Sequence, residues 1–475
     1  MRSDTCLFAA TGRRCINPPM GIAHQGWGAQ RHERAEGIDL DLWTTALALS
    51  DQSSKVIILD LDLIFLSGEG ANRLRSVISA ATGVPAECIR CSWTHSHSSP
   101  VTDKTWVQKG YDLVPPWLEA VNDLSAQAAC EALSNLQPVE VYAGRGECLI
   151  NINRRALTAE GRLICGKNRE GSSDHEVLVV KLDGLNGKTV ATLVNYACHP
   201  TVLGPPNRLV TPDYPGVVKR IVEDAVGGRC LFLLGAAGDQ GPIQGYLDDL
   251  SVYKSLGAIL GHEVAKVALS LSYIPAGETL REVLESGAPL GIYDEHFLKV
   301  SSLPLKVTTR EILVPLRTDL PEATVVSGTL RSWQKTIEVA RAHGDDQALR
   351  EAIFMGRRSD ILLRLIERLG TQTELAVETQ FICTGDVALV SCNFEPFSKT
   401  GFEIKRHSPF PVTLFSGYSN GYLGYMATSE ERRLGGYEVE ASPFGEGAAE
   451  IFQRQVLVTL HELRSMSEES PIRST

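Results

Sequence analysis

The stretch SKVIILDLDLIFL, residues 54–66, is the part of the sequence that decides the fold class. Its leucine and β-branched residues, with acidic residues in alternation, predict a strand. The next segment, GANRLRSVISAATG (70–83), has the apolar spacing of a helix, and AECIRCSWTHSHS (86–98) returns to strand character. A strand, a helix and a second strand in this order are typical of a sheet that is covered by helices.

The rest of the chain continues this alternation. Residues 116–136 have an amphipathic helical pattern, and residues 175–200 predict a hairpin that turns at Asn186 and Gly187. Later helices are predicted at 253–271, 348–370 and 447–466. Proline and glycine interrupt residues 274–324, which we interpret as an insertion or a change of layer. We predict a mixed α/β fold, with sheets covered by helices, in one large domain that spans residues 1–475.

Composition excludes several classes of partner. The chain has 475 residues, of which 43% are hydrophobic, and its formal net charge is −11. Since no cluster of lysine and arginine offsets this charge, neither nucleic acid nor an anionic membrane surface is an expected partner. No apolar run approaches the roughly 20 residues that a membrane span needs. The apolar stretch near the N-terminus is too short for a signal peptide, and the eleven scattered cysteines indicate reduced thiols. We therefore expect a cytoplasmic protein.

Polar side chains follow three predicted strands at the points where the strands end. His95 and His97 come after the strand at 86–98, and they face one cavity if that strand continues through them. An isolated His-x-His motif is equally compatible with two histidines bonded to backbone or water. However, His199 and Glu395 end two other strands in the same way. Histidine and carboxylate are the ligands that a catalytic zinc favours, so the threefold pattern indicates a zinc site.

Other motifs support different chemistry less well. GYSNG (417–421) matches the nucleophile elbow of a serine hydrolase, with Ser419 as the nucleophile. No aspartate follows it, and the one later histidine, His461, lies inside the predicted terminal helix. The glycine-rich GAAGDQGP (235–242) lacks the residues of a phosphate loop and is interpreted as a tight turn beside a site. CIRC (88–91) is interpreted as two buried thiols, because no second such motif accompanies it.

Six segments together resemble the neutral ceramidase family, zinc amidases that cleave the N-acyl bond of ceramide. THSHSSP is similar to the family's Thr-His-Thr-His-Ser-Gly-Pro, and GAAGDQGP to its Asn-Ala-Gly-Asp-x-Ser-Pro turn. NYACHPTVLGPPNRLVTPDYPG resembles the family's second histidine segment, and NINRR resembles its Asn-Arg segment. FEPFSKTG resembles the family's Glu-Phe segment, and YSNGYLGYMATSEERRLGGYEVEAS resembles its tyrosine-rich segment. Each motif is weak alone, but six in the same order are fairly specific.

This resemblance implies roles for particular residues. The implied zinc ligands are His95, His199, Glu395 and Tyr425. Tyr425 is preferred over Tyr422 because its spacing to Tyr437 fits the family pattern. His97 and Tyr437 are implied to contact the scissile amide and its developing oxyanion, and Arg154 is implied to lie at the edge of the site. The implied activity is zinc-dependent hydrolysis of a small or lipid-like amide.

The sequence also departs from the family pattern. Gly241 stands where the family has a serine, which excludes a serine nucleophile at that position, and Ser99 replaces a glycine. Family members continue into a C-terminal β-sandwich, which we do not expect in this protein. Because ceramide lies in membranes and a soluble intracellular protein is expected, the sequence does not establish ceramide as the substrate. Two alternatives to the zinc amidase follow from these features. One is a serine esterase that uses Ser419, and the other is a metal-binding homologue without catalytic activity.

Overall fold

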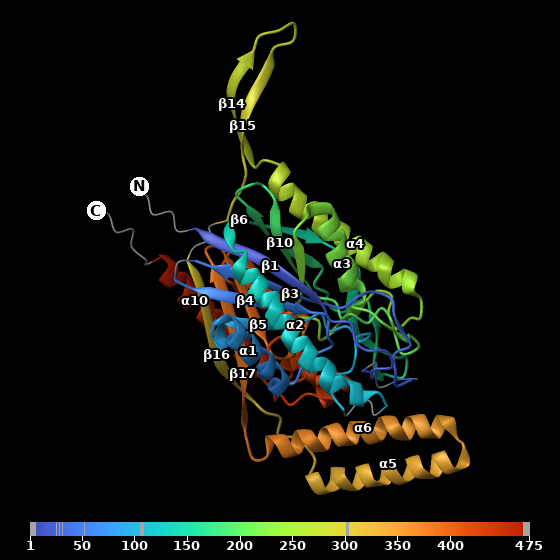
Figure 1. Ribbon diagram of the computed structural model, residues 1–475. Coiled ribbons are helices and arrows are strands. Elements are labelled where there is room, and N and C mark those ends of the chain that lie inside the picture. The colour runs from blue at the N-terminus through green and yellow to red at the C-terminus, as the bar shows by residue number, and fades with distance from the viewer. Residues whose placement is uncertain are drawn as a thin grey trace.

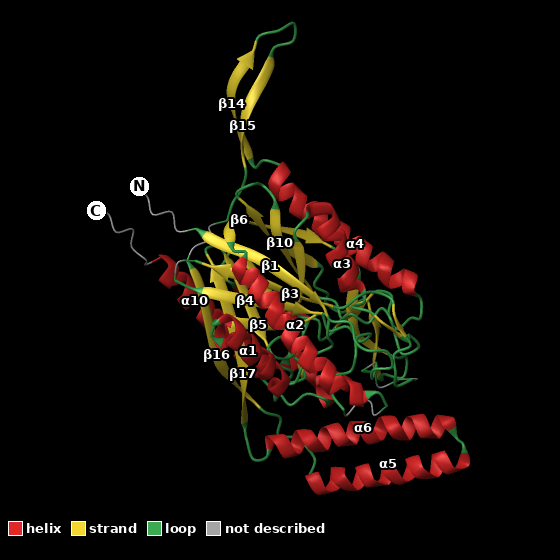
Figure 2. Cartoon of the chain, viewed as in Figure 1, coloured by secondary structure: helices red, strands yellow, loops and turns green. Residues whose placement is uncertain are grey.

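Two β-sheets packed face to face form the centre of the molecule, and helices cover their outer faces (Figure 1, Figure 2). The computed structural model describes residues 6–468 apart from 25, 28, 31, 52, 105–108 and 301–303. The larger sheet has eight strands, in the order β12 (Arg229–Leu234), β10 (Thr189–Tyr196), β9 (Glu176–Gly184), β6 (Gln137–Glu147), β1 (Leu7–Cys15), β3 (Trp43–Ser50), β4 (Lys55–Leu61) and β5 (Ile89–Trp93). The predicted mixed α/β class with helix-covered sheets is confirmed.

The strand–helix–strand unit predicted from residues 54–98 is present as β4, α1 (Gly68–Thr82) and β5, with β4 and β5 parallel. Helix α1 begins where the Ser67 side chain accepts a hydrogen bond from the Gly70 amide, and it ends at Gly83 with φ of 72°. The other helices on this face of the sheet are α2 (Val114–Ser134), α3 (Tyr214–Val226) and α4 (Leu250–Tyr273). The hairpin predicted at Asn186 and Gly187 is also confirmed, between β9 and β10.

The smaller sheet has four strands, β16 (Leu305–Pro315), β17 (Glu374–Thr384), β18 (Val387–Cys392) and β20 (Val412–Ser416). One of its faces packs on the larger sheet, where Leu389 and Leu414 meet Leu47 and Leu231 in a buried apolar layer. Its other face is covered by α7 (Ser398–His407) and α10 (Ala448–Glu468). Burial of apolar residues on both sides of each sheet stabilises this four-layer arrangement.

The larger sheet curls, so that strands at its opposite edges meet. The Phe232 amide of β12 donates a hydrogen bond of 3.0 Å to Asp60 Oδ2 of β4. Lys219 of α3 reaches the same buried place and donates to Asp60 and Asp62, at 3.2 and 2.7 Å. The ends of β5 and β10, which lie far apart in the strand order, are thereby brought to the same region. This curvature positions the candidate site.

Residues 274–371 leave the main body twice. Strands β14 (Gly277–Leu284) and β15 (Leu290–His296) pair with each other and project as an exposed hairpin (Figure 1). Helices α5 (Ala323–His343) and α6 (Asp346–Leu369) form a helical hairpin at the opposite end. The sequence predicted α6 but missed α5, whose Thr-Val-Val and Ser-Gly residues are poor helix formers. The insertion boundaries at 274–324 stay a prediction.

All eleven cysteines lie among the described residues and are free thiols. Cys91 is buried in β5, but Cys88 is only partly buried, so the interpretation of CIRC as two buried thiols is wrong for Cys88. Within the described part of the chain, every helix is too short or too polar to span a membrane.

Asp213 gives the fold a predicted pH dependence. Its side chain caps α3 and accepts hydrogen bonds from the Tyr214 and Leu203 amides. Burial raises its pKa from 3.8 to about 7. The folded carboxyl therefore binds its proton more tightly than the unfolded one, and stability decreases as the pH rises from about 4 to about 7. Between pH 5 and pH 7.5, the free energy of unfolding of the wild type should fall by about 2–3 kcal/mol more than that of Asp213→Asn, as measured by urea unfolding. Identical pH profiles for the two proteins would contradict this account.

Candidate metal centre and active site

Three histidines converge at the ends of β5 and β10. His199 follows β10, while His95 and His97 follow β5. Strand β5 ends at Trp93, and His95 has φ of 62°, so the expectation that a strand continues through His97 is wrong. A turn brings the two side chains together instead, with their ring centroids 5.2 Å apart. The His95 and His199 rings are 4.8 Å apart. Positive φ is uncommon for a residue other than glycine and is found repeatedly at functional sites.

Each histidine has a backbone carbonyl at its Nδ1 atom. These carbonyls are Ile64 O for His95 at 2.6 Å, Gly26 O for His97 at 3.3 Å and Ala237 O for His199 at 3.1 Å. A carbonyl only accepts, so Nδ1 carries the hydrogen and Nε2 bears a lone pair in all three rings. Backbone carbonyls hold metal-binding histidines in this tautomer and orientation.

The three histidines fit a metal ion. One ring nitrogen from each lies within 4.8 Å of the others, and this group could hold a metal. The Nε2 atoms of His97 and His199 are 3.2 Å apart. Two lone pairs at this distance repel each other unless a proton or a cation lies between them. Burial is the main cause that lowers the pKa of all three histidines, that of His97 to about 3, so at neutral pH they are neutral ligands or bases.

Glu395 completes the centre with a buried carboxylate. Its Oε1 lies 3.7 Å from His95 Nε2, and its Oε2 lies 3.8 Å from His199 Nε2. Among the described residues, Oε2 is buried without a hydrogen-bond partner. Burial raises the pKa of Glu395 to about 7. A buried carboxylate oxygen without a donor is destabilising, and a cation between it and the imidazoles would remove that penalty.

Two short paired strands hold the tyrosines beside Glu395. Strand β19 (Glu395–Pro396) pairs in parallel with β21 (Tyr425–Met426), and Glu395 is the register partner of Tyr425. The predicted ligand Tyr425 is therefore adjacent to the carboxylate. Tyr422, which the sequence analysis discounted, donates a hydrogen bond of 2.7 Å to Glu395 Oε1. Tyr418, which the sequence analysis missed, lies with its ring 4.7 Å from that of His95.

Arg154 and Tyr437 both lie against Tyr425. Arg154 belongs to β7 (Asn151–Leu157), is 4% exposed, and holds its guanidinium 5.5 Å from the Tyr425 ring centre. Tyr437 begins the short helix α9 (Tyr437–Glu440), with its ring 5.8 Å from that of Tyr425. Tyr437 is 43% exposed, so it is the member of the group that solvent reaches most easily. The structure thus brings all seven predicted site residues into one cluster, and their individual roles stay predictions.

Two aromatic residues that sequence reasoning missed form a wall beside His97. The Trp27 ring lies 4.6 Å from the His97 ring and 5.6 Å from the Tyr246 ring. Tyr246 has φ of 64°. Within the described residues, Trp27 Nε1 is buried without a partner. No sequence motif marks these two residues, because their contact depends on two loops that only the folded chain brings together.

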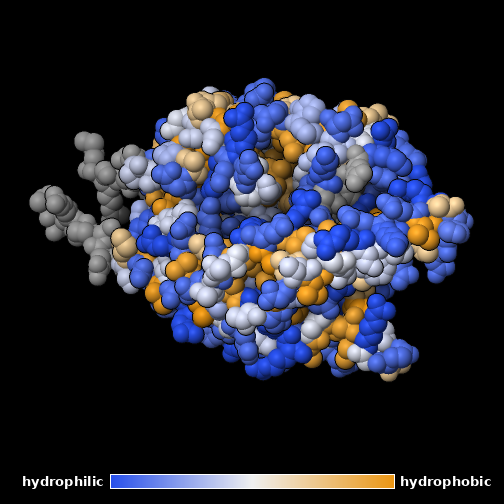
Figure 3. Space-filling model, turned by 90° about the horizontal axis from the view of Figure 1, so that it is seen from below, coloured by the Kyte–Doolittle hydropathy of each residue, from blue (hydrophilic) through white to orange (hydrophobic). Residues whose placement is uncertain are grey.

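Helix α6 contacts the segments on both sides of the cluster. Arg357 Nη1 donates a hydrogen bond of 3.1 Å to Gln30 Oε1, in the segment that carries Trp27. The next residue, Arg358, pairs with Glu440 of α9, the helix that carries Tyr437. Figure 3 shows the molecule from below, the side on which α5 and α6 lie in Figure 1; hydrophilic residues dominate this face, and apolar residues lie in a hollow near its middle.

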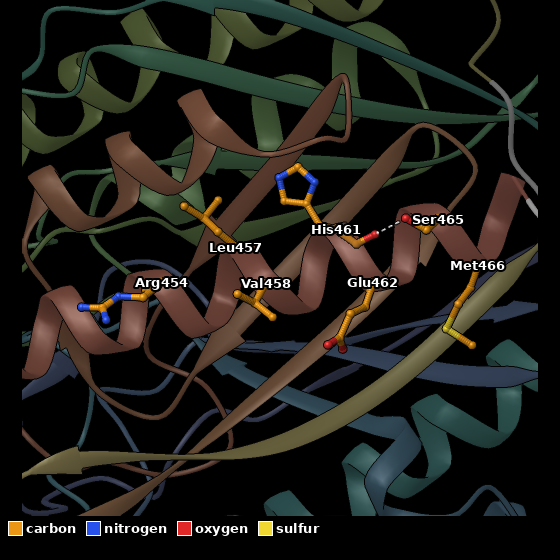
Figure 4. A pocket seen from close by; sticks show the side chains of 7 residues that line it. All are labelled: Arg454, Leu457, Val458, His461, Glu462, Ser465 and Met466. Atoms are coloured by element: carbon orange, nitrogen blue, oxygen red, sulfur yellow. Dashed lines mark hydrogen bonds between the residues drawn. The ribbon is translucent and has the colours of Figure 1, made fainter.

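Ser419 and His461 form their contacts outside this centre, although Tyr418 of the same elbow lies beside His95. Ser419 has no exposed surface, and its hydroxyl donates a hydrogen bond of 3.0 Å to the Cys392 carbonyl. His461 is exposed on α10 and lines a surface pocket there (Figure 4). The pocket is lined by residues of α10 alone, which are Arg454, Leu457, Val458, His461, Glu462, Ser465 and Met466.

Comparison with known proteins identifies the fold. No family model matches the sequence. Among solved structures, the chain is similar to the neutral ceramidase from Pseudomonas aeruginosa, with 17% sequence identity and a TM-score of 0.68, over 100% of this chain and 76% of that one. It is also similar to a ceramidase complexed with C2, with 16% identity and a TM-score of 0.68, over 99% of this chain and 78% of that one. The chain therefore has the neutral ceramidase fold.

Proposed function

We propose that the protein is a zinc-dependent amidohydrolase that cleaves the N-acyl bond of a small or lipid-like amide. The observation that supports this most is the convergence of three imidazoles, with their Nδ1 atoms bonded to carbonyls, on a buried carboxylate with one unpaired oxygen. The fold agrees with this proposal, since it is that of neutral ceramidases, and one similar structure is a ceramidase complexed with C2. Fold alone does not define an activity, so the site carries the argument.

Four residues are assigned to the metal. His95, His199, Glu395 and Tyr425 supply nitrogen and oxygen ligands of the kinds that zinc accepts. Zinc held there would polarise the amide carbonyl and lower the pKa of a bound water from 15.7 to about 7. Ligation by tyrosine requires an ionised phenol, and burial raises the pKa of Tyr425 above its usual value. The positive charges of the metal and of Arg154 would oppose this effect.

His97 is assigned to proton transfer. Its Nδ1 hydrogen is donated to the Gly26 carbonyl, which leaves Nε2 to accept a proton. Burial and the Arg154 charge lower the pKa of His97 to about 3, below the ordinary value near 6.5 that the sequence suggested. The imidazole is therefore neutral before the reaction. Its Nε2 accepts a proton from the water that attacks the carbonyl carbon and gives this proton to the amine nitrogen when the C–N bond breaks.

Tyr437 and Arg154 are assigned to the oxygen of the scissile carbonyl. The Tyr437 hydroxyl is a neutral donor, because the ordinary pKa of a phenol is about 10. Burial of the hydroxyl end raises the pKa of Tyr437 further, although 43% of the residue as a whole is exposed. Arg154 has a buried Nη2 without a partner among the described residues. Donors held in advance toward an oxyanion stabilise the transition state more than the bound substrate.

A scan of amide substrates tests the proposal. N-acyl amides with acyl chains from acetyl to palmitoyl, together with matched esters, are incubated with zinc-loaded protein and with protein treated with chelator. We expect amide hydrolysis with zinc and none after chelation. Inactivity with every substrate would overturn the proposal and favour the homologue without catalytic activity. Zinc-independent ester hydrolysis with phosphonate labelling of Ser419 would favour the serine esterase.

Gly241 provides a second test, because it stands where the family has a serine. A Cβ atom added there would lie 3.3 Å from the Cβ of Arg154, which is a tight contact. We expect Gly241→Ser to lower kcat/KM for amide hydrolysis by up to about tenfold, since it displaces Arg154. Gly241→Ala is the control, because it adds the same Cβ without a hydroxyl and should behave alike. A tenfold gain that is specific to serine would show that a nucleophile is needed there.

A further inference from the structure

Glu438 lies between two buried arginines, one of which is Arg154. Its Oε1 accepts from Arg154 Nε at 3.1 Å, and its Oε2 accepts from Arg155 Nη1 at 2.8 Å. Glu438 is 2% exposed, and the two arginines are 4% and 3% exposed. Hydrogen bonds between charged groups are stronger and more directional than neutral ones, particularly when they are buried. The three side chains therefore form a rigid unit.

Arg155 fixes this unit to the surrounding backbone. Its Nε donates to Glu431 Oε2 at 2.7 Å, and its Nη2 donates to the carbonyls of Glu431 and Gly435 at 3.1 and 2.7 Å. Its guanidinium also lies 5.3 Å from the ring centre of Phe397. With its donors occupied in this way, Arg155 is an anchor, and the Glu438 carboxylate has little freedom to move.

Arg154 is oriented by this anchor, and one of its donors is left free. Its backbone amide donates to the Asp239 carbonyl at 2.8 Å, and Glu438 holds its Nε. Nη2 is the donor that is buried without a partner among the described residues. An unpaired buried donor is destabilising, so its retention indicates that it binds a ligand oxygen.

The same carboxylate also fixes the backbone next to Tyr437. Glu438 is the second residue of α9, a helix of four residues that begins at Tyr437. So short a helix has little stability of its own, and the bonds from Glu438 to two arginines of β7 hold it against that strand. The position of the Tyr437 hydroxyl thus depends on Glu438 as well.

We propose that Glu438 is the positioning residue of the site: it sets Arg154 Nη2 and the Tyr437 hydroxyl to bind one oxygen of the acyl group. This inference rests on the proposed function for the identity of the ligand. It predicts that Glu438 contributes to catalysis only through Arg154 and Tyr437, and that the acid product of the reaction, a carboxylate, binds at the same donors.

Kinetics of a double-mutant cycle test this role. We expect Glu438→Gln to lower kcat for amide hydrolysis by about 30-fold or more with little change in KM. Glu438→Asp keeps the negative charge, and its kcat should fall less than that of Glu438→Gln. In a background that carries both Arg154→Met and Tyr437→Phe, Glu438→Gln should lower kcat by less than about threefold more, because both groups that it positions are already lost. Glu440→Gln is the matched control, since Glu440 lies on the same short helix but its side chain is exposed. The kcat of this variant should stay within about twofold of the wild-type value. An effect of Glu438→Gln that is undiminished in the background without both Arg154 and the Tyr437 hydroxyl would overturn the proposal.

Calorimetric binding of octanoate supplies a readout without turnover. Wild type and Glu440→Gln should bind octanoate equally, and Glu438→Gln should bind it about tenfold more weakly. Adding Glu438→Gln to the variant that carries both Arg154→Met and Tyr437→Phe should weaken octanoate binding no further. This pattern in a protein that hydrolyses no amide would support the positioning role and sink the proposed function. If wild type hydrolyses the amide but Glu438→Gln binds octanoate as tightly as wild type, the proposed function is supported and the positioning role is overturned. Glu438→Asp decides the matter if the glutamine variant does not fold.

Discussion

Replacing His199 with alanine is expected to remove both the bound metal and the hydrolytic activity. His199 has no exposed surface, and its Nε2 lies 3.2 Å from that of His97 and 3.8 Å from Glu395 Oε2. Loss of this ligand leaves His95, Glu395 and Tyr425, a set with a single imidazole, and we expect zinc to be lost at micromolar concentration. A metal supplies several kcal/mol of transition-state stabilisation, so kcat/KM should fall by about 10³-fold or more. Metal content by mass spectrometry and kcat/KM are the two measurements.

The matched control is His407→Ala. His407 lies at the end of α7, with its side chain 53% exposed and within ion-pair distance of Glu403. It should leave metal content and kcat/KM unchanged. If His199→Ala keeps one zinc per chain, or keeps its activity without metal, the assignment of this histidine is wrong.

Replacing Tyr437 with phenylalanine is expected to lower kcat by about 10²–10³-fold while the metal content stays the same. The ring is 43% exposed and touches Tyr425, so the variant should retain its packing and lose only the hydroxyl. Removing one donor from an oxyanion site costs about 2.7–4 kcal/mol in the transition state. Because the contact strengthens only as negative charge develops, KM should change little.

Tyr293→Phe is the control for this prediction, since Tyr293 is 52% exposed on the projecting hairpin strand β15. It should match wild type in kcat and in metal content. A Tyr437→Phe protein with normal kcat would exclude this tyrosine from catalysis. A protein that loses zinc instead would assign it to the metal.

Local patterns were enough to predict the fold class. Residues 54–98 carry the helix and strand periodicities, and these signals agree with the tertiary structure, in which Ser67 caps α1. Helix α5 was missed because its stability comes mainly from packing against α6, which a propensity argument does not include. The curl of the large sheet depends on contacts such as Phe232 with Asp60, more than 170 positions apart in the chain.

The candidate site was predictable in its residues but not in its geometry. Strand ends and family motifs identified the histidines and Glu395, and the structure brings them together. The turn at His95 was not predicted, because positive φ at a histidine has no sequence signal. Tyr422 was discounted on spacing alone, although it donates the hydrogen bond to Glu395. Trp27 lies beside His97 through a contact between two loops, which local patterns do not encode.

The most direct test of the central claim, that these histidines and Glu395 hold a catalytic zinc, is anomalous diffraction at the zinc edge from crystals of protein purified without chelator. The account predicts one strong anomalous peak among the Nε2 atoms of His95 and His199 and the carboxylate of Glu395. A crystal with these side chains ordered, with zinc supplied and with no peak at this place would contradict it.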